Sequence, residues 1–223
     1  DLLRRYEPAV HYTLGEMFFP CAVDGYLQRT SLWLADSAQK TSHIVEPGPL
    51  TTAKLAEFRS ARLGSSYYLK LVDEPLQALA YQRWRARPDR VPFPSPNRLQ
   101  RVGLVTRILD GLFDLSLVMR GRVPGGTAAA AEQAYQTILA QDSRRVYSGR
   151  VVRAGGYIVL HYIFFYVMND FRSTFSGVND HESDWEQVFV YLSDEGDAAP
   201  QPRWVAYASH DFSGDDLRRR WDD

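Results

Sequence analysis

The alternation of apolar and polar positions separates strand-like segments near both ends of the chain from a helical middle. Residues 157–168 form an unbroken apolar run, rich in aromatic and β-branched side chains, which predicts a central strand covered on both faces. The dipeptide Gly155-Gly156 in front of this run predicts a tight turn that joins it to residues 146–153 as a hairpin. A run of this length is too short to cross a bilayer.

Residues 49–145 follow a helical period instead. The segment 99–119 carries apolar residues three and four positions apart, which predicts an amphipathic helix, and the alanine-rich segment 128–141 predicts another. The pattern as a whole predicts an α+β fold: an antiparallel β-sandwich core, forming a single domain over residues 1–223, with residues 49–145 as a mainly helical insertion.

The apolar stripe of segment 99–119 has two interpretations. It faces the core, which is the more common meaning of such a stripe, or it lies on a membrane surface. Asp110 and Asp114 within the segment weigh against anionic lipid. The membrane interpretation rests on the arginines that flank the stripe: Arg101, Arg107, Arg120 and Arg122.

The segment 181–186 concentrates candidate chemistry at the start of a predicted strand. Alternation along a strand places Asp184 and Glu186 on one face, close to His181 in the preceding turn. These three side chains could hold a divalent cation, act as an acid/base pair, or form a solvated surface, and the pattern leaves all three open. The opposite face would carry Trp185, Phe189 and Tyr191.

A second histidine lies at the end of the next predicted strand. Residues 204–210 are predicted to form another strand, which ends in His210 and is followed by the turn-forming pair Ser213-Gly214. Two adjacent strands could therefore bring His210 to the same site. The charged segment 215–220 further along is typical of a solvated tail.

The order of these elements resembles a known family. The pattern His-x-x-Asp-Trp-Glu, strand, loop, strand, Ser-His is similar to the vacuolar protein sorting-associated protein 62 family and, more distantly, to the necrosis- and ethylene-inducing peptide-like toxins. Residues 5–10 and 16–24 are similar to that family's opening elements. The resemblance does not extend to about residues 49–145. The family carries a further Gly-Ser-His-Ala segment downstream, so we expect this chain to be part of a longer one.

The resemblance implies a β-sandwich with an acidic pocket at one edge. In the toxins such a pocket holds a divalent metal, and the matching residues here are His181, Asp184 and Glu186. The toxin site also includes an upstream aspartate, for which Asp170 is the candidate and Asp180 competes. The expected ion is calcium, magnesium or manganese rather than zinc. Ser183 replaces the second histidine of the toxin motif, and this departure weighs against membrane-damaging activity.

Composition narrows the class of protein. The 223 residues, 45% hydrophobic and 24% charged, suit a globular domain, and a net charge of −1 gives no reason to expect nucleic acid as a partner. The single cysteine, Cys21, excludes an intrachain disulfide, and its apolar neighbours predict a buried, unreactive thiol. Arginine outnumbers lysine 23 to 3, which favours a bacterial source with a GC-rich genome.

Three functions fit these observations. The first is a binding module whose acidic, metal-holding pocket (Asp170, His181, Asp184, Glu186, with His210, Asp180 and Trp185 nearby) recognises a glycan, a lipid headgroup or a membrane surface. The second is a metal-dependent hydrolase, with Glu186 or His210 as base. The third is a scaffold whose helical insertion binds a protein or membrane partner. Motifs for serine nucleophiles, phosphate loops and structural zinc are missing from the sequence.

Overall fold

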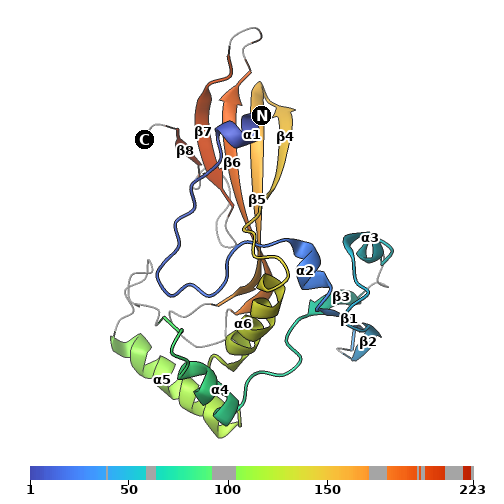
Figure 1. The fold of residues 1–223 in the computed structure, drawn as a ribbon, viewed down its shortest axis with the longest axis vertical. Coiled ribbons are helices and arrows are strands. Elements are labelled where there is room, and N and C mark those ends of the chain that lie inside the picture. The colour runs from blue at the N-terminus through green and yellow to red at the C-terminus, as the bar shows by residue number, and fades with distance from the viewer. Residues whose placement is uncertain are drawn as a thin grey trace. The chain divides into compact units, whose positions relative to one another are not determined.

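The computed structural model describes residues 1–38, 40–58, 64–91, 104–170, 180–194, 196, 199–208 and 218–221. These residues form two antiparallel sheets and several helices, so the predicted α+β class is confirmed (Figure 1). The chain divides into two compact units. Unit 1 comprises Asp1–Tyr12, Arg145–Phe165 and Trp185–Asp223, and unit 2 comprises Thr13–Arg144 and Tyr166–Asp184. The sandwich packing and the single domain stay predictions.

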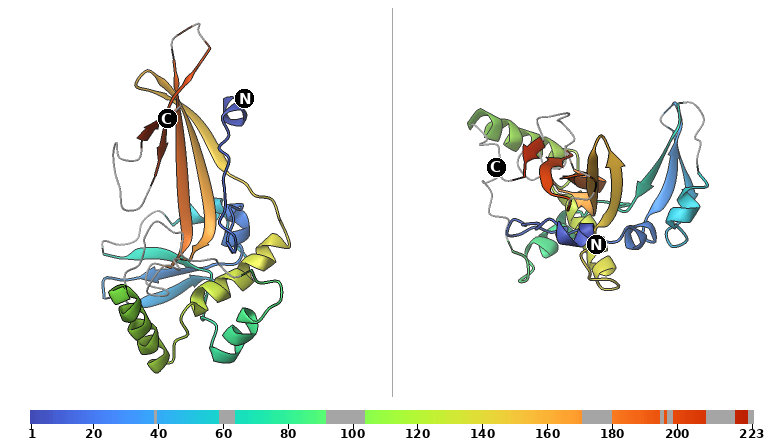
Figure 2. Two further views of the ribbon diagram at one scale, coloured as in Figure 1. Left: turned by 90° about the vertical axis from the view of Figure 1, so that its left-hand side faces the viewer. Right: turned by 90° about the horizontal axis from the view of Figure 1, so that it is seen from above.

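Unit 1 is built on the five-stranded sheet, whose strand order is β4-β5-β6-β7-β8; Figure 1 labels these strands, and Figure 2 shows the same ribbon from two further sides. Its two longest strands are shared between the units: β5 leaves unit 1 after Phe165, and β6 re-enters it at Trp185. The short helix α1 (Leu2–Arg5) opens the unit. The strands are β4 (Ser148–Ala154), β5 (Tyr157–Asn169), β6 (His181–Ser193), β7 (Pro202–Tyr207) and β8 (Arg218–Arg220).

Strand β5 is the central, doubly covered strand that the apolar run predicts. None of its 13 residues is exposed, and it lies between β4 and β6 in the sheet. The predicted hairpin is also confirmed, because Ala154 pairs with Tyr157 across a two-residue turn. Both turn glycines have positive φ, 57° at Gly155 and 79° at Gly156, which matches the mirror-image turn that the twist of a hairpin prefers.

Ring contacts between β5 and β6 fix which side chains share a face. Three pairs pack across the strands, with centroids 5.9 Å apart for Tyr157–Tyr191, 4.2 Å for His161–Phe189 and 4.8 Å for Phe165–Trp185. The β6 members of these pairs are two, four and six positions apart, all even numbers. Trp185, Phe189 and Tyr191 therefore lie on one face, as alternation predicts.

The first residues of the chain are held in unit 1 by one buried tyrosine. The Tyr162 hydroxyl lies 2.9 Å from the carbonyl oxygens of both Leu3 and Tyr6, and it donates its one proton to either of them. Burial raises the pKa of Tyr162 to about 12. Tyr6 in turn donates to the carbonyl of Pro200, 3.3 Å away. Residues more than 150 positions apart are thereby joined.

Unit 2 combines the second sheet with most of the helices. The sheet has the order β2-β1-β3, with strands β1 (Ser31–Ala35), β2 (Thr41–Val45) and β3 (Ser66–Lys70). Strand β3 lies inside the segment predicted to be mainly helical, yet it pairs along its whole length with β1. The helices are α2 (Val23–Leu27), α3 (Thr52–Leu55), α4 (Ala78–Arg85), α5 (Leu104–Met119) and α6 (Gly126–Leu139).

Helix α6 packs against α4 through a buried carboxylate. Glu132 Oε2 accepts a hydrogen bond of 2.9 Å from the Trp84 indole, and both Glu132 oxygens lie 3.1 Å from Arg87 Nη2. Gln136 donates to the same carboxylate at 2.9 Å. Gly126, the first residue of the helix, packs closely against the backbone of Leu76: a Cβ at this position would lie 2.7 Å from the Leu76 carbonyl oxygen. The helix is thus fixed at its start and its middle.

Candidate functional site

The motif residues His181 and Asp184 form a pair at the start of β6. Their side chains are three positions apart, and Nε2 of His181 lies 3.2 Å from Oδ1 of Asp184. Between them, Ser183 takes φ = 64°, a conformation that a non-glycine residue adopts only at a cost. The Asp184 side chain is 8% exposed and that of His181 is 43% exposed. A buried carboxylate therefore orients an accessible imidazole.

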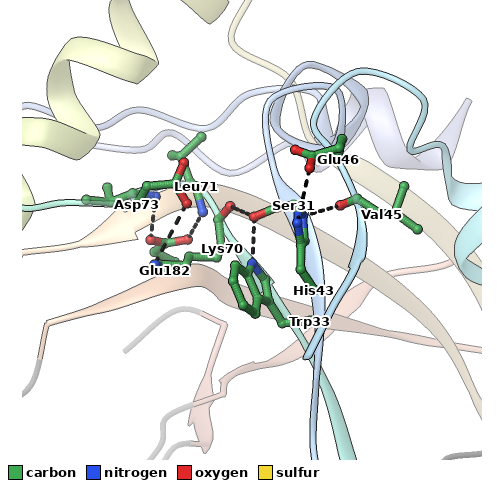
Figure 3. A network of polar contacts seen from close by, with 10 residues as sticks. Ser31, Trp33, His43, Val45, Glu46, Lys70, Leu71, Asp73 and Glu182 are labelled. Atoms are coloured by element: carbon green, nitrogen blue, oxygen red, sulfur yellow. Dashed lines mark hydrogen bonds and ion pairs between the residues drawn. The ribbon is translucent and has the colours of Figure 1, made fainter. Parts of the chain in front are cut away.

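The neighbouring Glu182 has a different role, which the sequence does not reveal. Its carboxylate accepts hydrogen bonds from the backbone N–H groups of Leu71, at 2.5 Å, and Val72, at 3.0 Å, and Figure 3 shows Glu182 beside Leu71. The Tyr26 hydroxyl donates at 3.4 Å. Burial raises the pKa of Glu182, against the opposing effect of these donors and of nearby Lys70. Glu182 thus ties the start of β6 to the residues that follow β3.

The structure describes all but one of the other predicted site residues. Glu186 is exposed, and so is Trp185 at 42%. Asp170 directly follows β5, and Asp180 directly precedes β6. His210 lies outside the described residues. Within the ranges that the structure describes, no three histidine, cysteine, aspartate or glutamate side chains gather as a metal-holding group. Of the predicted set, the structure brings together His181 and Asp184, and the four-ligand site stays a prediction.

The histidine in the middle of β5 is a core residue. His161 Nδ1 accepts from Arg150 Nε at 2.9 Å, so its proton sits on Nε2, which faces Gln187 Oε1 at 2.7 Å. Burial, aided by the Arg150 charge, lowers the pKa of His161. The neutral ring stacks on Phe189. Both nitrogens are engaged, so neither has a lone pair for a metal.

A row of stacked rings crosses the three-stranded sheet. The Trp33 ring lies between His43, with centroids 4.6 Å apart, and Tyr68, at 6.4 Å, each inclined by 20° (Figure 3 shows the first pair). Their strand positions are directly opposite one another. The Trp33 indole also donates to Ser31 Oγ at 2.8 Å. Because these rings cover one another's faces, the row stabilises the pairing of the strands.

Helix α5 is amphipathic, but it turns its apolar face to solvent, which is the reverse of the common arrangement. Its apolar stripe faces outward, so the interpretation as a core-facing stripe is wrong. Eight large apolar side chains are between 51% and 81% exposed: Leu104, Val105, Ile108, Leu109, Leu112, Leu115, Val118 and Met119. The half-buried residues of the helix include two acids and a serine: Asp110, Phe113, Asp114, Ser116 and Leu117.

A cavity of about 340 Å³ adjoins the C-terminal end of α5. Asp180 lines it, together with Phe113, Leu117 and the arginines Arg120 and Arg122. Its walls carry one aspartate and two arginines, so the charge of the cavity does not by itself indicate which ligand it would bind. Asp180 is thereby placed beside α5, a neighbourhood that the motif pattern does not reveal.

Comparison with family models, with curated proteins and with solved structures finds no match for this chain. The resemblance to the vacuolar protein sorting-associated protein 62 family and the toxins therefore stays a prediction.

Proposed function

We propose that this protein is a binding module for membrane surfaces and that α5 is the element that enters the interface. The observation that carries the proposal is the outward apolar face of α5, eight side chains each more than half exposed. A contiguous apolar surface of this kind on a folded protein marks a place where something binds. Successive residues of a helix are about 100° apart around its axis, so these eight positions span about half of the circumference.

The dimensions of α5 suit a helix that lies in the plane of the interface. Its 16 residues extend about 24 Å at 1.5 Å per residue. In the part of the chain that the structure describes, no helix combines the length and the apolar character needed to cross a membrane. An interfacial helix buries its apolar face among the headgroups and acyl chains while its other face remains outside.

The charges near α5 are arranged for anionic lipid. Arg107 is exposed on the helix, and Arg120 and Arg122 are exposed just beyond its C-terminal end. Asp110 and Asp114 are half-buried and lie on the side of the helix opposite the apolar face, so they would not meet the lipid. The two acids that weigh against a membrane in the sequence are therefore turned away from it.

The free energy available from the apolar face is sufficient for reversible binding. Complete burial of a large apolar side chain contributes roughly 1.5–3 kcal/mol, so covering the exposed part of one that is just over half exposed contributes about 1 kcal/mol. Eight such side chains supply on the order of 8 kcal/mol before the cost of association is subtracted.

The test is vesicle co-sedimentation of the whole chain. The variant Ile108→Gln/Leu112→Gln/Leu115→Gln removes about 3 kcal/mol of burial, so its partition onto phosphatidylcholine–phosphatidylserine vesicles should fall about 100-fold. Leu79→Gln is the matched control, because Leu79 on α4 is also exposed, at 70%. Circular dichroism should show unchanged helix content in both.

Two outcomes would contradict the proposal. One is equal vesicle binding by the triple variant and the wild type. The other is no vesicle binding at all, together with a concentration-dependent dimer in gel filtration that the triple variant loses. That second result would assign the apolar face to another copy of the chain.

The divalent-cation pocket is a second candidate, favoured by the His181–Asp184 pair alone. A cation that binds only the folded state must raise the melting temperature. Calcium, magnesium, manganese and zinc should each be added to chelated wild-type protein and to Asp184→Asn. A rise in wild type that the variant lacks would support the pocket, and no rise with any ion would remove it and, with it, the hydrolase.

A further inference from the structure

A second surface, entirely within unit 1, has the features of a ligand site. A groove of about 820 Å³ runs along the end of the sheet where the Gly155-Gly156 turn, the end of β6 and the start of β7 meet β8. Its wall is closed on one side by the β7–β8 pairing, in which Trp204 lies opposite Arg220 and Trp221 N–H donates to the Arg203 carbonyl.

The groove combines two arginines with aromatic rings. Arg203 and Arg220 line it together with Trp204, Trp221 and Tyr157, and none of its described lining residues is acidic. Asp194, which directly follows β6, is paired with Arg153 at 3.1 Å and is not among the described residues that line the groove. The described part of the lining therefore carries two positive charges and no negative one, whereas the chain as a whole has a net charge of −1.

The arginines of β8 are held in place before any ligand arrives. The guanidinium carbons of Arg218 and Arg220 lie 4.9 and 5.8 Å from the centre of the Trp204 ring, within the range of a cation–π contact. A side chain that is already ordered loses less entropy when it binds a ligand. Trp221 is 41% exposed beside them, so part of its ring is open to a ligand.

We infer that this groove binds a phosphate carried on a sugar-type ring. Guanidinium groups match the oxygens of a phosphate in geometry and charge, so the two arginines of the described lining favour the phosphate of such a ligand. The apolar face of a polyhydroxylated ring packs against an indole such as that of Trp221. The same chemistry occurs in soluble sugar phosphates and in the headgroups of phosphorylated inositol lipids.

The experiment is calorimetric titration of the whole chain with glucose-6-phosphate, with glucose and with inorganic phosphate. Glucose-6-phosphate should bind, and Arg220→Gln should weaken it about tenfold or more, because a charge-assisted hydrogen bond is lost. Arg219→Gln is the matched control, since Arg219 lies next to Arg220 on β8 and does not line the groove. Its affinity should equal that of the wild type.

A second arm identifies the source of the ligand. Vesicles of phosphatidylcholine with phosphatidylinositol phosphate are compared with phosphatidylcholine alone, again for wild type and Arg220→Gln. If phosphatidylinositol phosphate increases vesicle binding by the wild type and Arg220→Gln loses this increase, the groove binds the lipid headgroup. If glucose-6-phosphate binds and the lipid causes no such increase, the groove binds a soluble ligand. Either supports the inference.

The inference is overturned if neither ligand binds, if Arg220→Gln and Arg219→Gln weaken binding equally, or if inorganic phosphate binds as tightly as glucose-6-phosphate. It does not depend on the proposed role of α5. The triple variant in α5 should bind glucose-6-phosphate as the wild type does, so failure of one proposal is distinguishable from failure of the other.

Discussion

Removal of the Glu132 carboxylate should destabilise unit 2 more than any other single truncation between α4 and α6. The carboxylate is buried and accepts hydrogen bonds from Trp84, Arg87 and Gln136. Glu132→Ala would leave the Trp84 indole N–H, in a side chain that is 4% exposed, without an acceptor in the core. It would also leave the Arg87 guanidinium without its partner.

The magnitude follows from the burial of each donor. An indole N–H left unsatisfied in a core costs about 1–3 kcal/mol. The pair with Arg87 is worth about 1 kcal/mol, at the low end for a charge-assisted bond, because the Arg87 side chain is 31% exposed and solvent screens it. Together these losses predict a decrease of about 3 kcal/mol in the free energy of unfolding.

The assay is urea unfolding at neutral pH, followed by circular dichroism, for the wild type, Glu132→Ala and Glu132→Gln. Glu132→Gln keeps one acceptor oxygen for Trp84 and should lose only about half as much. A double-mutant cycle with Trp84→Phe isolates the bond between the two side chains, and its coupling energy should be about 1 kcal/mol.

The reasoning would be refuted if Glu132→Ala cost less than about 1 kcal/mol, since that is the least that one buried unsatisfied donor costs. Equal losses in Glu132→Ala and Glu132→Gln would show that the volume of the side chain matters and its acceptors do not.

Three further outcomes are expected. Burial, with a smaller effect of Asp142, raises the pKa of Cys21 to about 11, so Ellman's reagent at pH 8 should react only after urea unfolds the chain. Because Ser183 has φ = 64°, Ser183→Gly should leave the free energy of unfolding equal or higher, whereas Ser183→Val should lower it by about 1–2 kcal/mol. Thermal unfolding measures both changes. Gly126→Ala should lose about 1–3 kcal/mol in urea unfolding because its Cβ meets a backbone oxygen, while Gly111→Ala, which meets nothing, should gain up to about 1 kcal/mol.

Elements set by local pattern could be predicted from the sequence. The hairpin through Gly155-Gly156 and the buried strand β5 depend on a turn dipeptide and an apolar run that lie within one short segment. The His181–Asp184 pair also could be anticipated, because its members are three residues apart. Thr51 caps α3 by accepting a hydrogen bond from the N–H of Lys54, a local interaction that threonine favours at this position.

Features that depend on distant partners could not be predicted. Glu182 meets backbone donors 110 and 111 residues away, and no local pattern marks it as different from its acidic neighbours. Strand β3 has its pairing partner β1 outside the helical segment that surrounds it. For α5, periodicity establishes that one face is apolar but not whether the rest of the protein covers it, so the more common interpretation was the wrong one.

The attachment of residues 1–12 to Tyr162 and Pro200 sets the order in which the chain can fold while it is being synthesised. Translation proceeds at about 5–20 residues per second, so α1 waits roughly 10–40 s on the ribosome before Pro200 exists. The last segment of unit 2, Tyr166–Asp184, emerges before the last segment of unit 1, which begins at Trp185. Unit 2 therefore has all its parts before unit 1 does, and Tyr6 has its partner Pro200 only after the last segment of unit 2 has been made.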